Sequence, residues 1–192
     1  MSNPNRKREQ PAQVGRPRDP EVDRTVLVAT RELLLERGYE RLSIEAVARR
    51  AGVGKASIYR RWPGKAPLVL QAAFTTDDLP RVDDFAGQLR ALVRLAVADF
   101  VRDEARAALP GLIVEGAQEP QVLVQVMQPE LELLRAAMKK GEALGEVRPN
   151  VDPFLVLELY SGAVMLRSLR GVPLTTAFAD DLFDTLLRGV RP

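Results

Sequence analysis

The 192-residue sequence contains neither cysteine nor histidine. Without cysteine the chain cannot form a disulfide framework or a thiolate metal site. Without histidine it lacks the commonest general base and metal ligand, so Ser-His-Asp and Cys-His nucleophile systems cannot be built. We therefore expect no metal and no cofactor. Carboxylate pairs such as Asp103/Glu104 are neighbours on a helix and diverge by about 100°, so we do not expect an enzyme.

Long hydrophobic segments are missing as well. No apolar run reaches the roughly 18 residues that a membrane-spanning helix needs, and the first residues carry charge without a hydrophobic segment after it. These absences argue against a signal peptide and against a membrane partner. We expect a cytoplasmic protein.

The charge of the chain is unevenly distributed. Residues 1–65 contain 15 Lys and Arg against 8 Asp and Glu, whereas residues 66–192 contain 13 against 18. A basic third joined to an acidic remainder indicates that only the first part faces a polyanion. Solvated surface charge alone is an alternative explanation of the same imbalance.

Hydrophobic residues recur at helical spacing from residue 20 onward, and no run has the alternation of a strand, so the sequence predicts an all-α fold of about nine helices. Helix starts are expected at Ser43, at Asp83 or Asp84, at Asp152 before Pro153, and at Thr175 or Thr176. The predicted domains are a flexible basic arm (1–19), a DNA-binding domain (20–65) and a helical ligand-binding and dimerisation domain (66–192). The expected later helices cover about 65–74, 84–100, 104–117, 121–143 with a kink or split at Pro129, 153–170 and 176–190.

Residues 43–62 have the pattern of a helix-turn-helix, with two short helices joined by the tight turn Gly52-Val53-Gly54. The second helix surrounds the apolar Ile58 with side chains that can bind phosphates or read base edges. Ser43 and Lys65 stand at helix starts, where free amides and partial positive charge favour a phosphate. The candidate DNA-binding residues are Ser43, Lys55, Ser57, Tyr59, Arg60, Arg61 and Lys65.

Residues 42–65 (LSIEAVARRAGVGKASIYRRWPGK) resemble the DNA-binding domain of the tetracycline-repressor (TetR) family, and the likeness covers about residues 20–74. The resemblance implies that Lys55, Tyr59 and Lys65 hold DNA phosphates and that Ser43 adds a hydroxyl contact. It also implies that Ser57 and Arg60 approach base edges. The sequence departs from the family pattern at Gly54, Arg61, Trp62, Gly64 and Pro67, which leaves the base preference open.

The segment 153–170 is apolar on almost every side, so it must be covered on every side. A second subunit is the expected cover, and a fully internal core helix is the alternative. The resemblance likewise implies that the last two helices pair with their mates, giving a homodimer on a near-palindromic operator. The candidate interface residues are Leu155, Leu159, Gly162, Leu166, Phe178, Leu182, Phe183 and Leu186.

The resemblance further implies a pocket among the C-terminal helices, whose occupation shifts the fourth helix and releases DNA. Few charged residues fall on the inward faces, so we expect a small apolar or aromatic effector. Candidate lining residues are Phe100, Met127, Met138, Tyr160 and Met165, although apolar residues at helical spacing are more often plain core. The predicted function is a transcriptional regulator, a repressor released by its effector; the alternative is an effector-independent or architectural DNA-binding protein.

Overall fold

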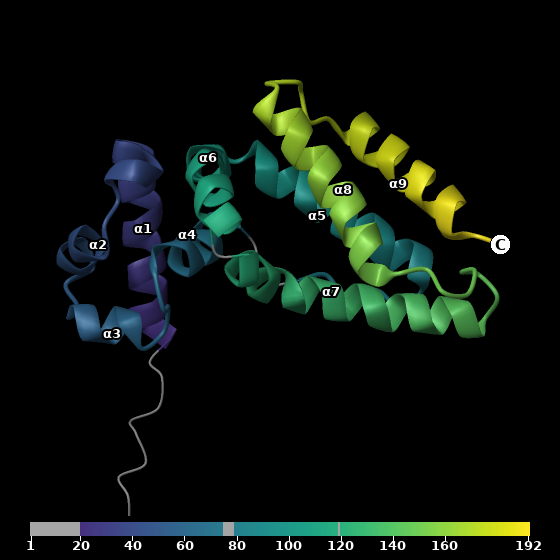
Figure 1. Ribbon diagram of the computed structural model, residues 1–192, viewed down its shortest axis with the longest axis horizontal. Helices are drawn as coiled ribbons and strands as arrows, with labels where there is room; N and C mark the ends of the chain where they lie inside the picture. The colour runs from purple at the N-terminus through teal and green to yellow at the C-terminus, as the bar shows by residue number, and fades with distance from the viewer. Residues whose placement is uncertain (1–19, 75–78, 119) are drawn as a thin grey trace, which may run out of the picture.

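The computed structural model describes residues 20–74, 79–118 and 120–192, without the side chains of 120–123, 125 and 126. The predicted basic arm, residues 1–19, lies outside these residues. All regular structure in the described ranges is helical, which confirms the all-α prediction (Figure 1). The helices are α1 (Pro20–Arg41), α2 (Ile44–Ala51), α3 (Lys55–Tyr59), α4 (Lys65–Ala73), α5 (Phe85–Val101), α6 (Asp103–Gln118), α7 (Pro120–Ala143), α8 (Pro153–Leu169) and α9 (Thr176–Val190).

Side-chain caps begin four of these helices where the sequence predicts them. The Ser43 hydroxyl accepts a hydrogen bond from the Ala46 amide at 3.2 Å. Asp84, Asp152 and Thr175 cap α5, α8 and α9 in the same manner. Each cap satisfies an amide that the first turn leaves without an intrahelical partner. Of the kink or split expected at Pro129, the split does not occur, because α7 continues through that residue as one helix.

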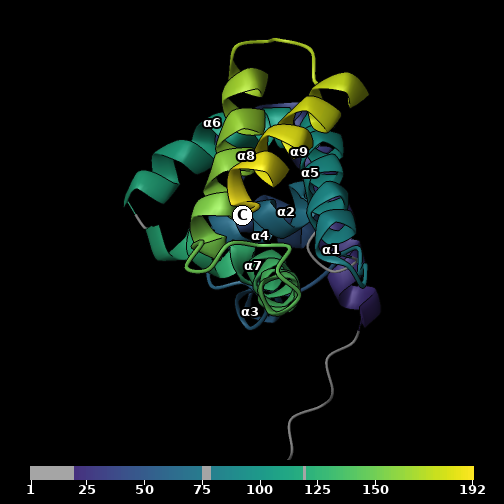
Figure 2. The same cartoon turned by 90° about the vertical axis from the view of Figure 1, so that its right-hand side faces the viewer.

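The helices enclose two hydrophobic cores. The first joins α1, α2, α3 and α4 and also takes in Ala108 and Leu112 of α6. The second joins α5, α7, α8 and α9, with α5 contacting the other three (Figures 1 and 2). Because Ala66 and Leu68 of α4 lie in the first core, that core extends past the boundary predicted at Lys65.

Tyr39 joins the first core to α6. Its ring lies against Gly111, where an added Cβ would stand 2.0 Å from the ring. Its hydroxyl donates a hydrogen bond to Glu115 of α6, and the Lys65 ammonium lies 4.1 Å above the ring centroid. Glycine at position 111 is therefore required for this close approach between α1 and α6.

The C-terminal end of α4 is held by two arginines from different parts of the chain. Arg31 Nε of α1 donates to the Ala72 carbonyl at 2.6 Å, and Arg102 Nη2 donates to the Ala73 carbonyl at 2.5 Å. These contacts satisfy carbonyls that the end of a helix leaves free. We call this pair of contacts the α4 clamp.

No helix in the described ranges is long and apolar enough to cross a membrane.

Candidate nucleic-acid interface and ligand cavity

The turn between α2 and α3 sets the position of α3. Gly52 adopts φ 67°, a left-handed conformation that ends α2 and that glycine adopts without steric cost. After the turn, Ile58 is completely buried. Trp62 is also buried, and its Nε1 donates to Gln71 Oε1 at 2.6 Å. These two anchors fix the inner side of α3 and leave its outer side to solvent.

The outer side of α3 presents three of the candidate DNA-binding residues. Lys55, Tyr59 and Arg60 are exposed, while Ser57 is partly buried. The Lys55 ammonium lies 3.1 Å from a Glu45 carboxylate oxygen. An exposed ion pair of this kind contributes little stability, so Lys55 can exchange Glu45 for a phosphate at small cost.

Ser43 and Lys65 flank this surface and are partly buried. The Ser43 oxygen already accepts the capping bond at α2, which leaves its hydroxyl hydrogen able to donate. Lys65 Nζ reaches the Tyr39 carbonyl at 3.4 Å.

The structure corrects the expectation for Arg61. Its side chain is only 10% exposed, and Nε is ion-paired with Asp23 of α1. Nη1 donates to the carbonyl and the hydroxyl oxygen of Ser57 at 3.0 and 2.9 Å. Arg61 therefore braces α3 against α1, and its Nε and Nη1 are engaged within the chain. The sequence could not reveal this, because Asp23 lies 38 residues earlier in the chain.

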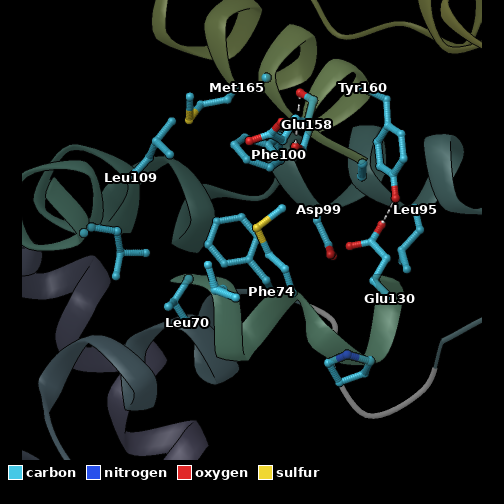
Figure 3. Close-up of a pocket in the computed structure, with 18 of the residues that line it drawn as sticks. Leu70, Phe74, Leu95, Asp99, Phe100, Leu109, Glu130, Glu158, Tyr160 and Met165 are labelled. Atoms are coloured by element: carbon cyan, nitrogen blue, oxygen red, sulfur yellow. Dashed lines mark hydrogen bonds between the residues drawn. The ribbon is translucent and has the colours of Figure 1, made fainter. Parts of the chain in front are cut away.

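A cavity of about 460 Å³ lies among α4, α5, α6, α7 and α8 (Figure 3). Phe100, Met127, Tyr160 and Met165, four of the five expected pocket residues, are among those that line it. Phe74 of α4 packs against Phe100 with ring centroids 5.2 Å apart. The volume is typical of sites for small molecules.

Met138 was expected in this cavity and does not line it. The side chain is 4% exposed and belongs to the second core. Met138 follows Met127 by 11 residues, so the two lie on nearly the same side of α7 but about 16 Å apart along its axis. The helical period predicts the correct side of the helix and cannot say where along it the cavity ends.

Three carboxylates that the sequence did not indicate also line the cavity: Asp99 of α5, Glu130 of α7 and Glu158 of α8. The Tyr160 hydroxyl donates to Glu130 at 2.6 Å. Burial raises the pKa of Glu130, and the hydrogen bond from Tyr160 partly opposes this rise. Glu130 stands three residues after Met127, and this spacing was the available signal that both face the same cavity.

One side of α8 exposes a continuous apolar stripe. Leu155, Leu159, Leu166 and Leu169 are 49–57% exposed, and their spacing places them on one face. Gly162 lies in the middle of the stripe, and a Cβ there would meet nothing within 4 Å. This stripe contains four of the expected interface residues. Phe178 and Leu182 of α9 are only partly buried.

Phe183 and Leu186 were also expected at the interface, and the structure contradicts this. They are 2% and 6% exposed within a single chain. Both belong to the second core, because α9 turns this side toward α5. The Arg90 guanidinium of α5 covers the Phe183 ring at 4.0 Å. This part of the α9 stripe that the sequence suggests for pairing is therefore used inside the subunit.

Comparison with known proteins gives the same assignment for both halves of the chain. Residues 26–72 match the family model of bacterial regulatory proteins of the tetR family, and residues 79–186 match the tetracyclin repressor-like C-terminal domain. The chain is similar to the HTH-type transcriptional regulator YdeS of Bacillus subtilis, with 29% identity over 92% of this chain and 93% of that protein. It is also similar to the DNA-binding transcriptional repressor TetR of Mycobacteroides abscessus, with 29% identity over 87% and 93% of the two chains. Among solved structures, the TetR family transcription regulator SCO0332 superposes with a TM-score of 0.65 and 31% identity, covering 90% of this chain and all of that one.

Proposed function

Because the chain belongs to the TetR family of bacterial regulatory proteins, we propose that it represses transcription as a homodimer and is released from its operator by a small molecule bound in the cavity. The chain is a DNA-binding transcriptional regulator. The family evidence points to regulation rather than catalysis. Since its target is chromosomal DNA, we place its work in the cytoplasm.

The proposed DNA contact is made by α3 in the major groove. Lys55 and Tyr59 hold phosphates on this surface, and Ser43 and Lys65 hold phosphates at its flanks. Ser57 of α3 and Arg60, the residue that caps its C-terminal end, are the candidates for reading base edges, because both carry donors suited to that task. The exposure of Lys55, Tyr59 and Arg60 supports this proposal.

Dimerisation through the α8 stripe would place two α3 helices on successive major grooves. A symmetric dimer covers the same face of each subunit. The exposed leucines of α8 would therefore be buried in both subunits: Leu155, Leu159, Leu166 and Leu169. The open position at Gly162 allows the two α8 helices to approach closely. Phe178 and Leu182 lie on the neighbouring α9 and extend the proposed interface.

The observation that carries the effector proposal is the shared wall between the cavity and the first core. Leu70 of α4 and Leu112 of α6 line the cavity and also belong to the core that holds the DNA-binding helices. Interiors are closely packed, so a ligand that displaces these side chains must move α4 or α6. Such a movement would change the separation of the two α3 helices and lower operator affinity.

Selection of bound genomic fragments by the purified protein tests the DNA-binding part of the proposal. We expect a near-palindromic sequence whose half-sites are about one or more helical turns apart. Fragments without shared sequence would contradict it. Screening for compounds that release the selected operator without unfolding the dimer then tests the effector. If binding to the operator is unchanged by every compound that occupies the cavity, the protein acts without an effector.

A further inference from the structure

The cavity wall carries negative charge without positive charge. Its described lining includes Asp99, Glu130 and Glu158, and no lysine or arginine. The charge of Asp99 is balanced by Arg102, which does not line the cavity, because Arg102 Nη2 lies 2.9 Å from an Asp99 carboxylate oxygen. No ion pair joins Glu130 or Glu158 to a basic side chain among the described residues. The cavity therefore has an excess of negative charge.

Glu130 is the deepest of the unbalanced carboxylates. Its oxygen accepts the Tyr160 hydroxyl at 2.6 Å, and Asp99 lies close enough to raise its pKa further by repulsion. Figure 3 shows Asp99 and Glu130 beside each other below the Tyr160 ring. Glu158 of α8 is exposed and lies on the same cavity. A partly buried carboxylate without a cation is costly, so a bound positive charge would relieve this site more than a neutral group would.

The remainder of the wall suits the apolar body of such a ligand. Phe74, Phe100 and Phe154 line the cavity together with Met127 and Met165. Aromatic faces attract cations, and thioethers adapt to irregular apolar shapes. An anionic ligand would meet the unbalanced carboxylates of Glu130 and Glu158 in the same space and would be repelled.

We propose that the cavity binds a hydrophobic cation, an apolar molecule that carries one protonated or quaternary amine and places it against Glu130. This inference rests on the proposed effector function and refines the expectation of a purely apolar effector. The positive charge of such a ligand can also affect the position of α4. Asp99 shares Arg102 with the Ala73 carbonyl, so a cation that attracts Asp99 competes with Arg102 and loosens the α4 clamp.

The test uses the full-length dimer and three probes with the same tail: decyltrimethylammonium, decanol and decanoate. Calorimetric titration should give the ammonium at least about tenfold tighter binding than the alcohol, and the carboxylate the weakest binding. Glu130→Gln keeps a hydrogen-bond acceptor for Tyr160 and should abolish the preference for the ammonium. Glu132→Gln makes the same change on the exposed side of α7 and should leave the preference unchanged.

The outcomes separate this inference from the proposed function. Equal or tighter binding of decanol or decanoate by the unmodified protein overturns the inference, whatever the variants do. If decanol then releases operator DNA in a mobility-shift assay, the effector function stands without the cation. If none of the three probes binds, the inference fails, and the compound screen on the selected operator decides the effector function separately. Retention of the ammonium preference by a folded Glu130→Gln protein would also overturn the assignment of Glu130.

Discussion

The surface of α3 and the cavity among α4 to α8 carry charges of opposite sign. Lys55 on α3 and Arg60 at its C-terminal end are exposed, whereas Asp99, Glu130 and Glu158 line the cavity. The first site is open to water and salt, and the second is partly enclosed by apolar side chains. The two sites should therefore prefer ligands of opposite charge and respond differently to ionic strength and pH.

A change of ionic strength should give the largest difference between the ligand affinities of the two sites. If each subunit contacts about four phosphates, log K for operator DNA should fall with log salt at a slope near −7. This corresponds to a loss of roughly ten-thousand-fold between about 50 and about 200 mM salt. Binding of decyltrimethylammonium should change far less, because partly buried charges are screened less. A DNA slope shallower than about −3, measured by fluorescence anisotropy, would contradict the proposed docking.

A charge placed in the exposed stripe of α8 should break the proposed dimer on which DNA recognition depends. Leu159→Glu buries a carboxylate in the proposed α8 interface and should lower operator affinity by about a hundredfold or more, since each monomer then binds alone. Sedimentation should show the monomer. Leu144→Glu is the matched control, because Leu144 is an exposed leucine outside the stripe. A dimeric Leu159→Glu protein would rule out this interface.

Two neighbouring arginines sharpen the description of the basic surface. Arg60→Ala should cost about 1–3 kcal/mol of operator binding and relax the preference at one or two base pairs. Arg61→Ala should instead lower the free energy of unfolding by about 1–3 kcal/mol, because it leaves Asp23 without its partner. Chemical denaturation and binding to operator variants measure the two effects. Loss of base preference without loss of stability in Arg61→Ala would reverse the two assignments.

The smallest effect expected is the pH dependence of protein stability and of cation binding in the cavity. Burial raises the pKa of Glu130 above its ordinary 4.5, so the unliganded protein loses stability as pH rises from 4.5 through that raised pKa. Cation binding requires the ionised carboxylate, and its affinity should fall by a few-fold to about tenfold as pH falls through the same range. Tyr160 and Asp99 lie beside Glu130, and Glu158 lines the same cavity. Glu130→Gln should therefore flatten the calorimetric pH profile without removing every change.

The sequence predicted the basic surface better than the acidic cavity, for a physical reason. Caps such as Ser43 and the turn at Gly52 are set by contacts within a few residues, so their pattern is visible locally. The resemblance then assigned roles to Lys55 and Tyr59. Glu130 shows the opposite case. Its position against Tyr160 depends on how α7 packs on α8, and 30 residues separate them.

The other differences between the predicted and the observed sites also arise from tertiary packing. An apolar stripe on a helix indicates that one side must be covered and does not say by which partner. Phe183 and Leu186 are covered by α5, and the exposed leucines of α8 are covered by no described residue. Arg61 looks like another DNA-binding residue in the sequence because Asp23 is brought to it only by the tertiary fold.

The α4 clamp has a consequence for how this protein can diversify. Arg31 and Arg102 both hold main-chain oxygens, at Ala72 and Ala73, and a carbonyl is present whatever side chain those positions carry. These two contacts therefore do not depend on the side chains at positions 72 and 73, although both alanine side chains are themselves fully buried. A chimaera that combines residues 1–74 with the remainder of a relative should keep a working connection, provided that both arginines and the contact between Tyr39 and Gly111 are retained. Such interchangeable halves would let one operator be placed under the control of different chemical signals.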